Sequence, residues 1–118
     1  MTVQQLADQK PFTTKDGSTI RSILDLTNAP VKNQSLAEAT LPPGAATDRH
    51  YHKLSEELYF VLEGSGDMEI DGERKSVGPG DAILISPGAW HQITASGGDL
   101  RFLCCCSPPY SHEDTYFA

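Results

Sequence analysis

The chain has 118 residues, of which 38% are hydrophobic and 21% are charged, and it carries a formal net charge of -7. This length suits one domain with a modest core, and this balance is typical of a soluble globular protein. The excess of acidic side chains argues against nucleic acid and against an anionic membrane as partners, because both are bound through basic patches.

Proline and glycine interrupt the sequence at short intervals, and no long stretch has the apolar period of a helix. This spacing predicts an all-β sandwich or barrel. Residues 1–18 are interpreted as an extended arm with one short strand, and residues 19–118 as a single domain. We expect about nine strands, over residues 19–27, 35–44, 48–52, 56–64, 66–70, 73–77, 82–86, 91–95 and 101–107.

The sequence also predicts local structure at one turn and in the C-terminal tail. Asp71-Gly72 is a dipeptide that is favoured in two-residue hairpin turns. In the tail, residues 110–118, Ser111 is placed to cap a short helical turn.

Histidines and a carboxylate cluster in the segment from His50 to Glu57. His50 and His52 alternate on one expected strand and so project to the same side, whereas Tyr51 points away. Residues 53–56 are enough to turn the chain back, which would place Glu57 at the start of the neighbouring strand. Two imidazoles and a carboxylate that converge in this way suit a divalent transition metal.

A third histidine, His91, follows the turn at residues 87–90. An antiparallel barrel could bring it to the same cluster. The alternative is that His50 and His52 are surface residues at an exposed strand end, with His91 a satisfied interior histidine. The joint pattern of three histidines and Glu57, all at strand ends beside Gly and Pro turns, favours a metal site.

Residues 44–64 resemble the first motif of the cupin family. Five residues match this motif at the family's spacing: Gly44, His50, His52, Glu57 and Gly64. Residues 80–91 resemble the second motif through three residues: Gly80, Gly88 and His91. Two departures, Ser86 in place of a proline and Ala95 in place of a frequent asparagine, concern turn geometry rather than ligands.

The resemblance implies an RmlC-like double-stranded β-helix, which is a jelly-roll barrel. It implies one divalent transition metal per chain (Mn, Fe, Ni, Cu or Zn), bound by His50, His52, Glu57 and His91. Positions left open on the metal would serve water, substrate or dioxygen. It also implies a homodimer that buries apolar outer strand faces and exchanges the arm of residues 1–18.

Two functions are compatible with this resemblance. The first is a small metalloenzyme that acts on a small-molecule metabolite, as a dioxygenase or as a sugar or sugar-phosphate isomerase or lyase. Glu57 would then be both a ligand and a candidate proton shuttle. The second is a non-catalytic module that binds or senses a metabolite, with a structural metal. The enzyme is favoured, although a fold alone does not decide a reaction.

Four further residues are candidates for the substrate pocket. Tyr59 alternates to the ligand face of its strand and could line the cavity or fill the barrel. Met68 is interpreted mainly as core. Trp90 could form part of the pocket wall or pack at a dimer surface. Arg101 would suit a carboxylate or phosphate substrate if it faced inward, and is otherwise a solvated arginine.

The three cysteines are consecutive, Cys104 to Cys106, and are interpreted as free thiols because neighbours on one strand cannot easily form a disulfide. Cys104 and Cys106 share a face and are interpreted as small buried hydrophobes, with metal or redox groups as the alternative. The N-terminus lacks a signal-peptide pattern, so we expect a cytoplasmic protein. His112, in the tail, is expected to lie away from the metal.

Overall fold

Nine strands and two short 3-10 helices make up the computed structural model, which describes all residues from Met1 to Ala118. Neither helix is long and apolar enough to cross a membrane. The helices are η1 (Leu6–Asp8) and η2 (His112–Asp114), and the strands are β1 (Phe12–Thr13), β2 (Thr19–Leu24), β3 (Ser35–Leu41), β4 (His50–His52), β5 (Glu56–Ile70), β6 (Glu73–Val77), β7 (Ala82–Ile85), β8 (His91–Ser107) and β9 (Thr115–Phe117).

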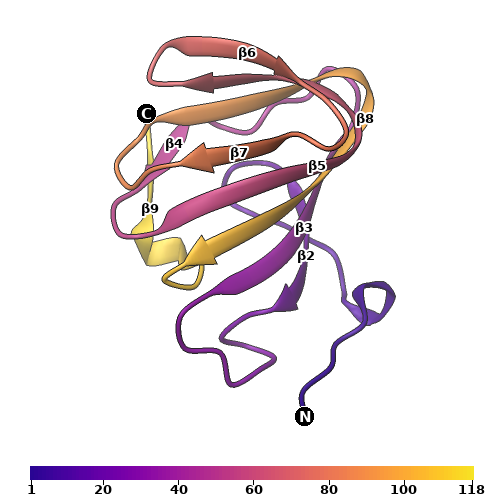
Figure 1. Ribbon diagram of the computed structural model, residues 1–118, viewed down its shortest axis with the longest axis vertical. Coiled ribbons are helices and arrows are strands. Elements are labelled where there is room, and N and C mark those ends of the chain that lie inside the picture. Colours follow the sequence, from indigo (N-terminus) through magenta and orange to yellow (C-terminus); the bar gives the residue numbers. More distant parts are fainter.

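The strands form one rolled antiparallel sheet (Figure 1). One path of neighbours runs β1-β2-β3-β8-β4-β9, and β5 pairs with β6, β7 and β8. The two longest strands, β5 and β8, run side by side through the barrel and join its two halves. The predicted all-β jelly-roll barrel is therefore confirmed.

The two long strands bend together at a corner that only glycine permits. Gly64 in β5 has a φ of +77°, and a Cβ atom there would lie 2.1 Å from the carbonyl oxygen of Asp99. Any side chain would collide with the backbone of β8. The register between β5 and β8 shifts between Val61 and Gly66, so both strands turn the corner without ending.

This corner explains why the predicted strand boundaries differ from the observed ones. The sequence pattern predicts separate strands over residues 56–64 and 66–70, and likewise over 91–95 and 101–107. Each pair is one continuous strand in the structure, because the hydrogen-bonded ladder carries on around the corner. The two mergers remove two strands from the expected nine, and the short strands β1 and β9 add two, so the observed number is again nine.

The local predictions for the turn and the tail are confirmed. Asp71 and Gly72 have φ values of 49° and 88°, the left-handed pair that a two-residue hairpin turn needs. The Ser111 hydroxyl accepts a hydrogen bond from the N–H of Glu113 and caps η2. The strand that follows, β9, was not predicted, and it pairs with β4.

Side chains that alternate to the inside of the barrel form the core. Six of the largest are at most 2% exposed: Leu41, Val61, Ile85, Ile93, Leu100 and Phe102. Full burial of one such side chain contributes about 1.5–3 kcal/mol. The core therefore holds together β3, β5, β7 and β8, and two of these strands, β5 and β8, carry residues of the site described below.

The N-terminal segment packs on its own barrel. Phe12 and Thr13 pair with β2, and the carbonyl oxygen of Asp16 accepts a hydrogen bond from the N–H of Asp48 at 2.7 Å. An exchange of residues 1–18 between two copies stays a prediction.

A half-buried ion pair ties the entry of β4 to β5. Glu69 is 6% exposed, and its carboxylate accepts hydrogen bonds from Arg49 Nε and from the N–H of Gly72, both at 2.7 Å. These contacts, the one with Arg49 foremost, hold the pKa of Glu69 below its ordinary value. Because the folded-state pKa is lowered, this stabilisation is present above the unfolded-state pKa and is lost as the pH falls through the folded-state pKa.

We therefore expect Glu69→Gln to lower the free energy of unfolding by about 1–2 kcal/mol at pH 7. The difference from the wild type should shrink as the pH falls below the unfolded-state pKa of about 4.3, and it should vanish once the pH is below the lowered folded-state pKa, where the wild-type carboxylate is protonated too. Urea denaturation at pH 7 and at a series of acidic pH values measures both effects. Glu73→Gln, at an exposed position of β6, is the matched control, and an equal loss in both variants would contradict the prediction.

Candidate metal centre

The three buried histidines meet inside the barrel. His50 in β4 and His91 in β8 are directly opposed partners of an antiparallel pair, with ring centroids 4.2 Å apart. His52 is two residues further along β4 and so projects to the same side. One ligand atom from each ring lies within 4.8 Å of the others, and the three residues are 0–4% exposed. The three imidazoles could hold a metal ion.

Each imidazole is anchored through the nitrogen that faces away from the cluster. Nδ1 of His50 and of His91 donate to the carbonyl oxygens of Asp48 and Ala89, at 2.7 and 2.9 Å. Nδ1 of His52 lies 3.3 Å from the carbonyl oxygen of Asp114. A proton on Nδ1 leaves the lone pair of Nε2 free, which is the arrangement that a metal-binding histidine needs.

Glu57 lies beside this cluster, at the start of β5. Its Oε1 is 3.3 Å from Nε2 of His52 and 3.5 Å from Nε2 of His91. Nε2 of His91 and Oε1 of Glu57 are buried and have no hydrogen-bond partner. Buried polar atoms without partners are uncommon in proteins and call for an explanation. A metal ion between them would supply one, so the residues present fit a metal.

The ionisation of the site follows from the same contacts. Burial alone would raise the pKa of Glu57, but the imidazoles of His52 and His91 prevail and hold it well below its ordinary value. The pKa of His52 is raised, because the contact with Glu57 outweighs the effect of burial. The pKa of His50 is lowered by burial and by the charge of His91.

The C-terminal tail holds the loop that joins His52 to Glu57. The carboxylate of Asp114 accepts hydrogen bonds from three consecutive N–H groups, at 3.0–3.1 Å: Lys53, Leu54 and Ser55. The carbonyl oxygen of the same residue faces His52. The tail therefore positions two residues of the cluster at once, a role that the sequence analysis did not assign to it.

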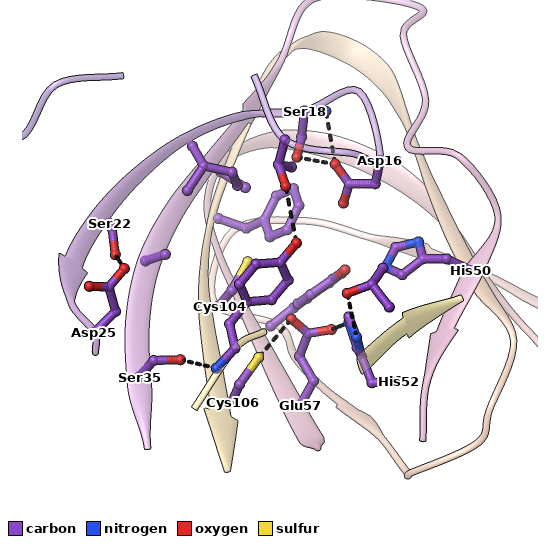
Figure 2. Close-up of a pocket in the computed structure, with 18 of the residues that line it drawn as sticks. Asp16, Ser18, Ser22, Asp25, Ser35, His50, His52, Glu57, Cys104 and Cys106 are labelled. Carbon is purple, nitrogen blue, oxygen red and sulfur yellow. Dashed lines mark hydrogen bonds and ion pairs between the residues drawn. The ribbon is translucent and has the colours of Figure 1, made fainter. Parts of the chain in front are cut away.

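A cavity opens beside the cluster because the facing strands carry small side chains (Figure 2). In the sheet register, Glu57 lies opposite Cys106 and Tyr59 opposite Cys104, while Ala37 on β3 is the next neighbour of Cys104. Residues this small at inward positions cannot fill the barrel. The inward positions of the other half carry larger side chains, which form the core described above.

The inward cysteines are neutral thiols. Sγ of Cys106 donates to Oε2 of Glu57 at 3.2 Å. Burial, with the nearby charge of Glu57, raises the pKa of Cys106 and that of Cys104. Both are free cysteines that line the cavity, and Cys106 orients the carboxylate so that Oε1 faces the imidazoles.

Of the four pocket candidates, Tyr59 lies in the cavity wall and the other three do not. Met68 is 3% exposed and belongs to the core beyond the glycine corner. Trp90 packs on the outside, with its ring 4.7 Å from that of Tyr51. Arg101 faces outward, because its neighbours on β8 alternate into the core, and it binds Glu38 and Glu63. Met68 therefore has the core position that the sequence favoured for it, and Arg101 has the outward position given as its alternative. The cavity wall that these candidates would have shared does not include Trp90.

Residues near both chain ends line the cavity although the sequence analysis did not select them. They come from the segment before β2 and from the tail: Thr14, Asp16, Ser18, Tyr110 and Thr115. Their contacts are long-range, as in the hydrogen bond between the hydroxyls of Thr14 and Tyr110 at 3.2 Å. The Asp16-Gly17 turn dipeptide was the one local signal available. His112 is exposed and bonds Tyr110 outside the cluster.

Comparison with protein families matches the cupin domain to residues 37–106. This segment is more than half of the chain and contains all four residues of the cluster. The chain belongs to the cupin family.

Relatives of known and unknown activity share this fold. The chain is 50% identical over 107 residues to the uncharacterized protein MJ1618 of Methanocaldococcus jannaschii, covering 90% of this chain and 86% of that protein. It is 31% identical over 86 residues to the L-ectoine synthase of Bordetella avium, covering 71% of this chain but 64% of the synthase, less than two thirds of its length. The polyketide cyclase RemF of Streptomyces resistomycificus matches with a TM-score of 0.79 and 28% identity, over 97% of this chain and 89% of the cyclase.

The anchoring role of Asp114 leads to a prediction. Asp114→Ala removes the acceptor of three N–H groups and should lower the free energy of unfolding by about 1–2 kcal/mol, since water replaces the lost bonds in part. Urea denaturation measures the change. Glu113→Ala, at the exposed neighbouring position, is the control and should be nearly neutral. Equal stability of the Asp114→Ala and wild-type proteins would contradict the anchoring role.

Proposed function

We propose that the protein is a metal-dependent enzyme that binds one divalent transition metal ion per chain through His50, His52, Glu57 and His91. The observation that carries the proposal is the pair of buried atoms without partners, Nε2 of His91 and Oε1 of Glu57. Each such atom costs about 1–3 kcal/mol when left unpaired. The nitrogen and oxygen donors suit Mn, Fe, Ni, Cu or Zn.

The chemistry is divided between the ion and the chain. A bound ion would supply Lewis-acid catalysis to a substrate oxygen or nitrogen. The protein's residues hold the substrate in the cavity and exchange protons with it. Burial and the charge of Glu57 raise the pKa of Tyr59 well above its ordinary value, so its hydroxyl in the cavity wall is a proton donor at neutral pH. Glu57 is the second candidate for proton transfer.

The relatives support an enzyme without naming its reaction. An ectoine synthase and a polyketide cyclase are both enzymes that act on small molecules. A dioxygenase, isomerase or lyase reaction is compatible with the same four ligands, and the small-molecule substrate would occupy the cavity next to them.

A structural metal in a non-catalytic, metabolite-binding cupin is the second candidate. The observation that favours it is the near-complete burial of the three imidazoles, which come from β4 and β8. A metal there would cross-link two strands that share a single paired position, His50 with His91.

We also propose that the protein is a homodimer formed through the outer face of β5 and β7. Leu58, Phe60 and Leu84 are 44–56% exposed on this face, and Leu58 lies directly opposite Leu84 in the sheet. Leu103 and Cys105 of β8 continue the same face. A contiguous apolar surface of this kind is typical of a protein interface.

The metal proposal is tested with protein purified without a histidine tag. Elemental analysis should find about one transition metal per chain, and His91→Ala should weaken metal binding by far more than the roughly tenfold loss typical of an outer-shell change. His112→Ala changes a histidine outside the cluster and is the control. Full metal content in His91→Ala would refute the site.

Removal of the metal separates the two candidate functions. If the metal is catalytic, the metal-free protein should keep its β-sheet circular dichroism and a cooperative unfolding transition. Unfolding at 25 °C on addition of a chelator would instead support a structural metal, because structural sites contribute folding energy directly.

The dimer is tested by light scattering. The wild type should have twice the mass of one chain, and Leu58→Lys with Leu84→Lys should convert it to the monomer, because charges desolvated in the interface are costly. Leu26→Lys changes a leucine that is 61% exposed elsewhere and is the control. A monomeric wild-type protein would refute this interface.

A further inference from the structure

The cavity beside the histidine cluster carries three acidic side chains and neither lysine nor arginine. Three carboxylates contribute to its lining, Asp16, Asp25 and Glu57, whereas no lysine or arginine does. The one arginine on the adjoining part of β8, Arg101, faces outward and is paired with Glu38 and Glu63. Away from the histidine cluster, an anionic group of a ligand would therefore find no lysine or arginine to pair with in this cavity.

Asp16 is held with one of its oxygens free. Oδ1 accepts hydrogen bonds from the N–H and the hydroxyl of Ser18, at 2.9 and 2.6 Å, and Ser18 is 1% exposed. The loop is fixed to the entry of β4 by the bond from Asp48 to the carbonyl oxygen of Asp16. Figure 2 shows Asp16 next to His50 at the edge of the cavity. The second oxygen, Oδ2, makes no hydrogen bond within the protein and is available to a donor on a ligand.

The remaining walls suit a ring. Aromatic side chains from four different segments line the cavity: Phe12, Tyr59, Phe102 and Tyr110. Tyr59 is 3% exposed and lines the cavity. Ala37 and Ala39 leave the space between the aromatic walls open. Flat apolar surfaces with a few polar groups bind ring-shaped ligands and orient them through their hydroxyls.

From this combination we propose that the cavity binds a ring-shaped, hydroxylated substrate that is uncharged in the part extending from the histidine cluster towards Asp16, and that Asp16 accepts a hydrogen bond from one of its hydroxyls. The inference rests on the proposed metal-dependent function and names the class of its substrate. Carboxylate or phosphate groups on that part of the ligand are repelled by Asp16, whereas the charge of Glu57 is offset by the metal ion that it binds. This disfavours sugar phosphates as substrates.

The test uses the zinc-loaded protein and three probes that share the same pair of neighbouring phenolic hydroxyls. They are 4-methylcatechol, which is neutral, 3,4-dihydroxybenzoate, which is anionic, and 3,4-dihydroxybenzylamine, which is cationic. Isothermal titration calorimetry should show the anionic probe binding at least about tenfold more weakly than the other two, the effect expected of a like charge some 7 Å away in a partly desolvated site.

Asp16→Asn is the matched variant, because its side-chain oxygen can still accept from Ser18. It should reduce the discrimination between the neutral and anionic probes to about threefold or less. Asp67→Asn removes an equal charge from the exposed face of β5 and should leave the discrimination unchanged.

The outcomes separate this inference from the function on which it rests. Zinc content is measured first, and a wild-type protein that binds no zinc refutes the proposed function together with the inference. If zinc binds, the inference alone is overturned by any of three results. These are equal binding of the neutral and anionic probes, binding of no probe at all, or unchanged discrimination in Asp16→Asn.

Discussion

The contact between His50 and His91 is the constraint on which the rest of the site depends. These residues form the one paired position between β4 and β8, and they bring imidazoles from chain positions 41 residues apart to a ring distance of 4.2 Å. Burying polar rings in a barrel is costly unless their nitrogens are satisfied. Three backbone carbonyls satisfy the outer nitrogens, and a metal ion would satisfy the inner ones. The barrel, the tail and the loop after β4 are all arranged around this requirement.

One pattern of alternation produces both the stable half of the barrel and the hollow half. Where the inward positions are filled by Val61, Ile93 and Leu100, the barrel is packed and supplies the stability of the fold. Where they are occupied by Ala37, Cys104 and other small residues, the same sheet leaves a cavity. The packed part and the hollow part of the barrel meet near the glycine corner of β5. The packed part therefore supports the site without occupying the cavity.

Segments near the two ends of the chain form part of the cavity wall. The family match covers residues 37–106, and it includes the histidine cluster and Glu57. Asp16 and Tyr110 lie outside this range, yet both line the cavity. The histidine cluster thus lies within the segment that matches the family, whereas part of the cavity wall comes from segments outside it.

The sequence by itself was enough to predict the barrel and to select the cluster. Alternation and turn residues are local signals, and the spacing of His50, His52 and Glu57 is set by one strand, one turn and the next strand. Local signals also predicted the Asp71-Gly72 turn. They misplaced the strand ends at the glycine corner, because glycine and polar residues mark a bend within a continuous strand in the same way as they mark the end of a strand.

Only the tertiary structure decided what surrounds the cluster. Arg101 faces outward because Leu100 and Phe102 on either side of it alternate into the core. Trp90 packs on Tyr51 rather than in the cavity. Asp16, Asp114 and Tyr110 reach the site through contacts that span most of the chain, and no local pattern encodes such contacts. The sequence therefore determined which residues could bind a metal, and the tertiary structure decided which walls a substrate would meet, because ligand spacing is local whereas the cavity is built from both ends of the chain.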